Sequence, residues 1–388
     1  MRICRIARQY PRASQPGALL AAYILSERLP YPCLYVAKVL DGPPIVTFSG
    51  HVTPLFIAYP EPSFPEGYKV SKVRMALVAA GKLLGNLIFT IRALPHFFRF
   101  KPDLFHVHTP LPIMPALVYK MLTRKPIVLT FHGTDYYRFR TSRLTRWMIR
   151  KFVDYVICIT PEQPDDFHTL MPDVPATYVQ NGVDLSVFSP DTSVAKRKQV
   201  VTVGRLTWQK GYDDLIKAMA KVIALEPDYR LVIVGDGSLH DKLSAIAQEV
   251  GIADKVEFTG MIPQGDVVKI LRESELYVMS SVSEGFPKAL IEAMSCALPI
   301  VVTDIGACAP VAKNAGLVVP PAQPEALAEA ILTMIRNPQQ RQAYAEQALR
   351  DAQRYGWEKH VQEVRAIYEH VLSTKTRDAN SRPATLSQ

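Results

Sequence analysis

Short apolar segments rich in β-branched residues alternate with helix-forming segments along almost the whole chain. Most of these segments are apolar throughout, which is typical of strands whose two faces are both covered. The expected strands are 3–7, 104–108, 126–131, 155–160, 177–180, 200–204, 230–235, 255–260, 276–280, 299–303 and 316–320. Strands that alternate with helices in this way predict a doubly wound α/β architecture with parallel sheets.

The length of 388 residues exceeds the size at which a single hydrophobic core stops growing. A polar, turn-rich segment at 181–199 interrupts the alternation and marks the expected domain boundary. We therefore predict two Rossmann-like domains, 1–184 and 185–354, that face each other across a cleft at the carboxyl ends of their strands. A helix at 355–373 is expected to pack back on the first domain, and the weakly apolar end at 374–388 is expected to be disordered.

The formal net charge of +9 is concentrated in the first half of the chain. Segment 69–101 carries Lys and Arg among aliphatic and aromatic residues and contains no Asp or Glu. This composition predicts an amphipathic helix that lies on an anionic membrane surface. The alternative is a core helix whose basic residues face solvent. A nucleic-acid partner is not expected, because no RNP-like, zinc-finger or helix-turn-helix signature accompanies the charge.

A cytoplasmic location is expected from the ends and the cysteines. The first residues carry several arginines where a signal peptide needs an apolar core, and the longest apolar stretch, 75–91, is too short to span a bilayer. The five cysteines are scattered without C-x-x-C spacing, so neither a disulfide framework nor a zinc site is expected.

The loop after strand 200–204 has the composition of an anion site. Arg205 and Lys210 follow the strand-ending Gly204, and Gly211 opens the next helix. Cations beside a helix N-terminus favour a diphosphate, because the free N–H groups add to the formal charges. The alternative is a solvated loop with two surface cations. The sequence is not a P-loop, and the later Gly235 and its neighbours lack the third glycine of a dinucleotide fingerprint.

Segment 283–294, SEGFPKALIEAM, places two glutamates around the start of a helix. Pro287 favours a helix that begins close to it, so Glu284 is expected in the preceding loop and Glu292 about a turn and a half into the helix. A carboxylate on an apolar helix face needs a partner, and ligand hydroxyls would provide one. The alternative is that Glu284 only complements the helix dipole and Glu292 faces solvent.

These motifs, taken in order, resemble the retaining GT-B glycosyltransferases of glycosyltransferase family 4. The resemblance runs from about residue 3 to 370 and is carried by PDLFHVH (102–108), VLTFHGTD (128–135), NGVD (181–184), GRLTWQKG (204–211) and EGFPKALIEAM (284–294). It implies that residues 1–184 bind the acceptor and that residues 185–354 bind a nucleotide-sugar donor.

The resemblance also implies roles for individual residues. Arg205 and Lys210 match the pair that grips the donor diphosphate and stabilises the charge of the leaving group. Glu284 matches the glutamate that contacts the transferred sugar, and Glu292 matches the one that contacts the ribose. His132 matches the histidine that contacts the sugar from the first domain.

Further donor contacts are implied for Gly17, near the phosphates or the acceptor, and for Phe286, Lys288, Ala289, Met261 and Ile262, the last two beside the base. No metal ion or other cofactor is expected, because Arg205 and Lys210 supply the positive charge. His106 and His108 are expected to be structural, with only one of them directed toward the cleft.

The implied reaction transfers a hexose-type sugar from a UDP- or GDP-sugar to a hydroxyl acceptor with retention of configuration. The basic first domain suggests a lipid-linked acceptor at the inner leaflet of the cell membrane, as in surface polysaccharide synthesis. A nonhydrolysing sugar-nucleotide epimerase and an inactive binding protein are the alternatives. The chain departs from the family pattern in its first loop, which has only Gly17, and at Ala307 and Pro310, where Gly and Glu are usual.

Overall fold

The computed structural model divides the chain into two compact units. Unit 1 consists of residues 1–179 and 361–388, and unit 2 consists of residues 180–360. The structure describes residues 1–9, 18–38, 47–58, 72–108, 113–132, 134–161, 163–306 and 308–380. The chain passes between the units at 179/180, close to the expected boundary at 184, and again at 360/361, where 354 was expected.

Unit 1 contains a seven-stranded sheet in the order β3-β2-β1-β4-β5-β6-β7, and its strand pairs are parallel. The strands are β1 (Ile3–Gln9), β2 (Cys33–Lys38), β3 (Val52–Ile57), β4 (Leu104–Val107), β5 (Ile127–Thr130), β6 (Tyr155–Cys158) and β7 (Ala176–Tyr178). The helices are α1 (Ala18–Arg28), α2 (Lys72–Phe100), α3 (Met114–Thr123), α4 (Thr134–Thr141), α5 (Arg143–Phe152), α6 (Gln163–Leu170) and α14 (Trp357–Asn380), which starts in unit 2.

Unit 2 contains a six-stranded sheet in the order β10-β9-β8-β11-β12-β13, again with parallel pairs. The strands are β8 (Arg197–Val203), β9 (Arg230–Val234), β10 (Val256–Phe258), β11 (Ser274–Met279), β12 (Ile300–Thr303) and β13 (Gly316–Val319). The helices are η2 (Trp208–Lys210), α7 (Tyr212–Leu225), α8 (His240–Glu249), η3 (Ala253–Lys255), α9 (Gln264–Glu273), α10 (Lys288–Ser295), α11 (Ala309–Ala312), α12 (Pro324–Arg336), α13 (Pro338–Ala352) and η4 (Gln353–Tyr355).

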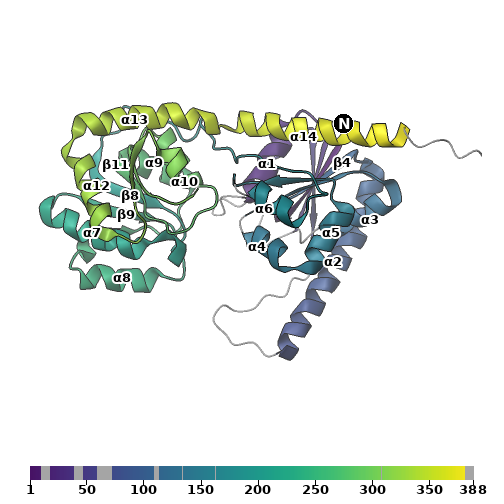
Figure 1. Cartoon of the computed structure of the whole chain (residues 1–388), viewed down its shortest axis with the longest axis horizontal. Helices are drawn as coiled ribbons and strands as arrows, with labels where there is room; N and C mark the ends of the chain where they lie inside the picture. The colour runs from purple at the N-terminus through teal and green to yellow at the C-terminus, as the bar shows by residue number, and fades with distance from the viewer. Residues whose placement is uncertain are drawn as a thin grey trace, which may run out of the picture. The chain divides into compact units, whose positions relative to one another are not determined.

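The predicted doubly wound α/β architecture is confirmed, and the uniformly apolar strands have the expected cause. In β4, Phe105 belongs to the core cluster that includes α2 and α3, whereas Leu104 belongs to the cluster that includes α14. Successive residues of a strand point to opposite faces, so a strand with a helix layer on each face needs apolar residues at neighbouring positions. Figure 1 shows α14, in yellow, lying along the unit that contains β4 and α1.

Two elements differ from the expectation. Strands β2 and β3 were not expected. Strand β3 contains Pro54, and a proline within a short apolar segment makes a strand less expected there. Because β3 is an edge strand, the missing N–H of Pro54 costs no hydrogen bond to a second neighbour. At the other end, α14 continues to Asn380, so residues 374–380 are helical where a disordered end was expected.

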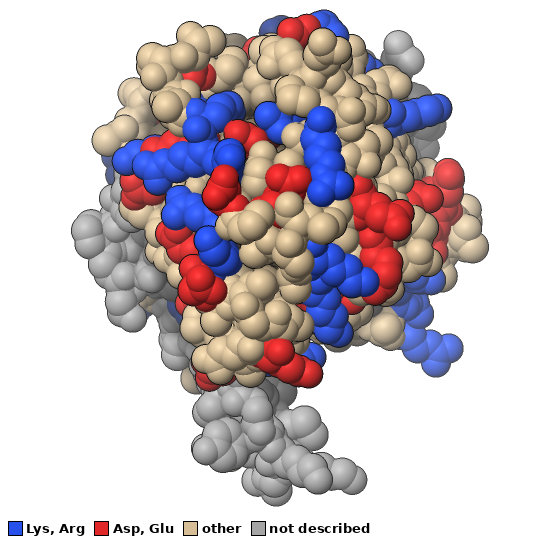
Figure 2. Space-filling model, turned by 90° about the vertical axis from the view of Figure 1, so that its left-hand side faces the viewer, with Lys and Arg blue, Asp and Glu red and all other residues tan. Residues whose placement is uncertain are grey.

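Charge is distributed as the sequence indicates. Figure 2 shows a face of unit 2 on which basic and acidic side chains are interspersed. Unit 2 also contains exposed ion pairs, such as Lys198 with Asp228 and Lys221 with Glu325. In the part of the chain that the structure describes, no helix is both long and apolar enough to cross a membrane.

We expect Phe97→Ala to destabilise unit 1 by about 3–5 kcal/mol, the usual cost of removing a buried aromatic ring. Phe97 is fully buried in α2, with its ring 5.1 Å from that of Phe105 and 6.0 Å from that of Tyr119. Its neighbour Phe98 is 46% exposed, so Phe98→Ala is the matched control and should cost less than half as much. Urea unfolding followed by circular dichroism measures both. Equal losses would contradict the assignment of the core face of α2.

Candidate functional site

The loop between β8 and α7 is shaped by glycines. Gly211 ends η2 and begins α7 with a φ of 58°, in the left-handed region. A Cβ atom at this position would lie 2.2 Å from the carbonyl oxygen of Ser280, a distance that real Cβ atoms do not adopt. The left-handed φ and the lack of space for a Cβ atom therefore both require glycine. Because Gly211 has no side chain, the backbone of this loop packs directly against the backbone of the loop after β11.

Hydrogen bonds hold these two loops together. The N–H of Val282 donates to the carbonyl oxygen of Gln209 at 2.8 Å, and the hydroxyl of Ser280 donates to that of Lys210 at 2.8 Å. Strands β8 and β11 are neighbours in the sheet, so the two loops leave the same edge side by side. The predicted cation loop and the predicted glutamate segment are thus parts of one site in unit 2.

Two ion pairs line this site. The ammonium group of Lys210 contacts the carboxylate of Glu284, and the two side chains are only 19% and 16% exposed. One helical turn apart in α10, Lys288 contacts Glu292, which is 7% exposed as a residue. Partly buried pairs are screened less than surface pairs, so both interactions remain strong in salt. Arg205, the remaining predicted cation, is exposed at the start of the loop.

Glu284 lies close to two neutral groups, the hydroxyl of Tyr277 in β11 and the thiol of Cys308 between β12 and α11, and Glu292 lies close to the first. Burial raises the pKa of the Tyr277 hydroxyl, and the nearby Tyr212, Glu284 and Glu292 raise it further. Burial likewise raises the pKa of Cys308 to about 12, with a further increase from Glu284 that Lys210 opposes. These groups stay protonated at neutral pH, so the charge of the site comes from the lysines and the glutamates. Tyr277 was not predicted as a site residue, and its hydroxyl has no hydrogen-bond partner among the described residues.

The remaining predicted donor residues occupy different environments. Phe286, Ala289 and Ile262 are half-buried and pack against the apolar cluster beneath α10, whereas Met261 is 53% exposed. The structure thus shows a packing role for Phe286, Ala289 and Ile262. Their contact with a donor stays a prediction. Gly17 lies outside the described residues.

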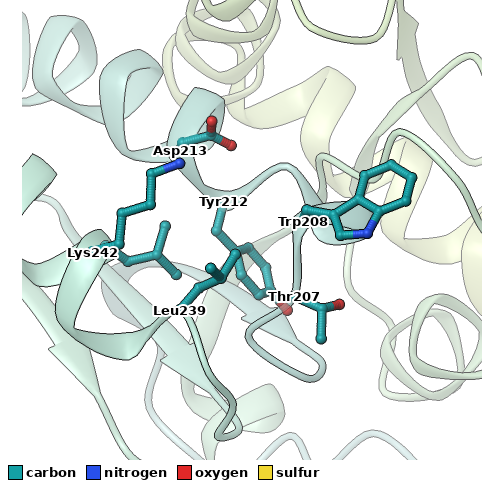
Figure 3. Close-up of a pocket in the computed structure, with 7 residues that line it drawn as sticks. Thr207, Trp208, Tyr212, Asp213, Leu239 and Lys242 are labelled. Carbon is teal, nitrogen blue, oxygen red and sulfur yellow. The ribbon is translucent and has the colours of Figure 1, made fainter. Parts of the chain in front are cut away.

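A small cavity of about 60 Å³ lies beside the same loop (Figure 3). Thr207, Trp208, Tyr212, Asp213, Leu239, Lys242 and Leu243 line it. Figure 3 shows the indole of Trp208 pointing away from Tyr212 and Leu239, and Trp208 is 68% exposed. The volume suffices for water but falls far short of the roughly 300 Å³ of a small-molecule pocket. None of the predicted donor residues lines this cavity, so we do not assign the donor to it.

Unit 1 holds the predicted histidine. His132 follows β5, is 8% exposed, and its Nε2 lies 3.3 Å from Nδ1 of His108. The two rings stack with an interplanar angle of 16°. The ring of His108 also lies 4.1 Å from that of His106, measured between centroids.

The expectation that His106 and His108 point to opposite faces of their strand, so that only one could be directed toward the cleft, is wrong in its premise. Side chains alternate along a strand with a period of two, so residues i and i+2 share a face. Both histidines therefore lie on the face of the sheet that His132 occupies. The regular spacing of 106 and 108 carried this information in the sequence.

The two parallel-sheet units with glycine-shaped loops at a carboxyl edge define an α/β protein of GT-B architecture. A sucrose-phosphate synthase from Thermosynechococcus elongatus has a similar structure over 96% of this chain and 99% of its own, with a TM-score of 0.77 and 18% identity. Anabaena HepE in complex with UDP-glucose is similar over 95% of this chain and 100% of its own, with a TM-score of 0.71 and 18% identity.

Sequence comparison specifies the family. Residues 50–187 match the model of Glycosyltransferase Family 4, and residues 188–351 match that of Glycosyl transferases group 1. The lipopolysaccharide core biosynthesis mannosyltransferase LpcC of Rhizobium leguminosarum bv. viciae is 31% identical over 274 residues, which are 66% of this chain and 75% of LpcC. The chain belongs to the group 1, family 4 glycosyltransferases.

We expect Gly211→Ala to destabilise unit 2 more than Gly251→Ala. Both glycines have a left-handed φ, 58° and 76°, so both substitutions carry a backbone cost of about 1 kcal/mol or more. Only at Gly211 would the new Cβ meet a backbone oxygen, whereas nothing lies within 4 Å at Gly251. The clash should add about 1–3 kcal/mol, measured by urea unfolding. Equal losses of unfolding free energy in the two variants would show that the loop of Gly211 and the loop after β11 can move apart without cost.

Proposed function

We propose that the protein transfers a hexose-type sugar from a UDP- or GDP-sugar to a hydroxyl acceptor with retention of configuration. The observation that carries this proposal is the pair of ion pairs, Lys210 with Glu284 and Lys288 with Glu292, at the carboxyl edge of the second sheet. HepE, which has a similar fold, is complexed with UDP-glucose and supports a nucleotide-sugar donor.

Donor binding exchanges the partners of these ion pairs. A diphosphate carries more negative charge than one carboxylate, so it draws Lys210 away from Glu284, and Arg205 joins from the start of the loop. The freed Glu284 carboxylate accepts hydrogen bonds from the hydroxyls of the transferred sugar. By the same exchange at Lys288, Glu292 accepts hydrogen bonds from the ribose.

The reaction then needs charge stabilisation more than a nucleophile. The bond between the anomeric carbon and the diphosphate oxygen breaks while the acceptor oxygen bonds to the same face of that carbon. A diphosphate oxygen takes the proton of the acceptor hydroxyl, and Arg205 and Lys210 stabilise the departing charge without a metal ion. His132 contacts the sugar, and no glycosyl-enzyme forms.

We expect Lys210→Ala to lower kcat by about 10² to 10³, the usual cost of removing one group that stabilises transition-state charge. Glu284→Ala should lower turnover as well. Lys221→Ala is the matched control, because Lys221 is exposed, lies in the second half of α7 and forms an ion pair with Glu325 of α12. The assay measures release of UDP or GDP from a panel of nucleotide sugars, with and without a lipid-linked acceptor.

Full turnover in the Lys210 and Glu284 variants would overturn the proposed mechanism. Conversion of the donor sugar without any acceptor would point to an epimerase. Nucleotide binding without turnover of any donor would favour an inactive binding protein.

We further propose that the acceptor is a lipid-linked glycan intermediate of surface polysaccharide synthesis and that unit 1 meets it at the cytoplasmic face of the membrane through α2. This helix has two opposite apolar faces. Phe89, Ala93 and Phe97 are buried at four-residue spacing, whereas Leu77, Leu84 and Ile91 are exposed at seven-residue spacing. LpcC acts in lipopolysaccharide core biosynthesis, which supports an acceptor of this kind.

The chemistry of the exposed face fits an anionic lipid surface. Leu83 and Leu87 widen the stripe, Arg92 is exposed beside it, and Lys82 is exposed on another side of the same helix. The short helix α5 of the same unit carries the exposed Trp147, an interfacial residue type, whose ring lies 5.2 Å from the ammonium group of Lys151. Apolar insertion combined with Lys and Arg is the pattern of helices that lie in a membrane interface.

We expect the double variant Leu83→Gln/Leu87→Gln to bind anionic vesicles at least about tenfold more weakly, because two apolar side chains no longer enter the interface. Leu225→Gln in unit 2, where Leu225 is 56% exposed, is the control and should bind normally. Co-sedimentation with phosphatidylglycerol vesicles measures the binding. Unchanged sedimentation of the double variant, or equal loss in the control, would contradict a membrane role for α2.

A further inference from the structure

One face of the first sheet changes from apolar to polar toward the carboxyl ends of its strands. On β4, Leu104 is followed on the same face by His106, and on β5, Val128 is followed by Thr130. On β1, Ile3 is followed by Arg5, which is fully buried. The polar side chains of this face therefore lie between the apolar core under α14 and His132.

Tyr368 of α14 joins these groups in a hydrogen-bonded chain. The guanidinium of Arg5 donates to the hydroxyl oxygen of Tyr368 at 2.9 Å, and that hydroxyl lies 2.6 Å from Nδ1 of His106. On the other side of the ring, Nε2 of His106 lies 2.7 Å from Oγ1 of Thr130. Arg5 also donates to the hydroxyl of Ser26 at 2.7 Å, and it has no carboxylate partner in the described part of the chain.

The chain has a defined direction because arginine can only donate. Tyr368 accepts from Arg5, so its own proton is available for Nδ1 of His106. Burial raises the pKa of Tyr368, which keeps this hydroxyl protonated. An imidazole that accepts at Nδ1 carries its proton on Nε2, where Thr130 accepts it. The contact of Tyr368 with Arg5 therefore favours the tautomer of His106 that has its proton on Nε2, and the hydroxyl of Thr130 can accept that proton.

His106 and His108 connect Tyr368 to His132, the residue proposed to contact the sugar. The ring of His106 lies against that of His108, with centroids 4.1 Å apart, and His108 contacts Nε2 of His132 at 3.3 Å. The rings of His106 and His108 are tilted by 34°, and those of His108 and His132 are stacked, so a ring that changes its tautomer or tilt alters the space and the hydrogen bonds of the next ring. Three imidazoles thus lie between Tyr368 and the carboxyl edge of the sheet.

We propose that Tyr368 is a positioning residue for His132: its hydroxyl sets the tautomer of His106 and, through the stacked His108, the orientation and hydrogen bonding of the His132 ring. This inference rests on the proposed function, in which His132 contacts the transferred sugar. It gives the carboxyl-terminal helix a role in the reaction beyond packing.

The test removes the hydroxyl alone, with Tyr368→Phe. Tyr35→Phe is the matched control, because Tyr35 is also fully buried and pairs in register with Arg5, but its hydroxyl has no hydrogen-bond partner among the described residues. Two-bond ¹⁵N–¹H spectra of the imidazoles, with ¹⁵N-labelled histidine, report each tautomer. The wild type should show His106 protonated on Nε2, and Tyr368→Phe should lower that population and shift the signals of His132.

In turnover, Tyr368→Phe should lower kcat on the order of tenfold, as expected for a lost buried hydrogen bond, with KM for the donor within about twofold. Tyr35→Phe should leave both values and the His132 signals unchanged. Thr130→Val removes the acceptor on the opposite side of the His106 ring and should shift the same signals, so the test does not depend on the folding of one variant.

Each result decides one question. Unmoved His132 signals in both Tyr368→Phe and Thr130→Val would overturn the inference, as would equal losses of kcat in Tyr368→Phe and Tyr35→Phe. A wild type without transferase activity would overturn the proposed function instead. The spectra would still decide whether Tyr368 controls the His132 ring, because they need no substrate.

Discussion

Parallel pairing in both sheets is the constraint on which the rest of this structure depends. It brings the carboxyl ends of neighbouring strands to one edge, so residues far apart in the sequence become neighbours without any special contact. In unit 2 this places the loop of Lys210 beside that of Glu284, and in unit 1 it places His108 beside His132. The helices on both faces make such a sheet possible, because they cover strands that are apolar throughout.

The site in unit 2 combines a rigid backbone with exchangeable charge. Gly211 permits the close contact between two loops, and backbone hydrogen bonds hold them in place. The charged side chains above this frame are paired with one another rather than with the frame. In the proposed reaction, a ligand that carries phosphate and hydroxyl groups would replace side-chain partners while the backbone keeps its position, which would keep the reorganisation cost of binding small.

Much of the fold and part of the site could be predicted from the sequence. Uniformly apolar strands predicted the helix-covered parallel sheets, and G-R-L-x-x-x-K-G with E-x7-E predicted which loops carry charge. Strand β3 was missed because Pro54 is compatible with a strand only at an edge, and strand order is not visible in the sequence. The shared face of His106 and His108 followed from their spacing but was misassigned. The contact of Tyr368 with His106 joins residues 262 positions apart, and no local pattern could indicate it.

The sequence by itself determined the class of fold, the family and the chemical types at the carboxyl edges, because periodicity and motif spacing are local properties of the chain. Only the tertiary structure decided the partners: Lys210 with Glu284, Lys288 with Glu292, and Arg5 with Tyr368. Partners depend on strand order and on which helix covers which face, and these arise when the whole chain minimises exposed apolar surface and unpaired polar groups together.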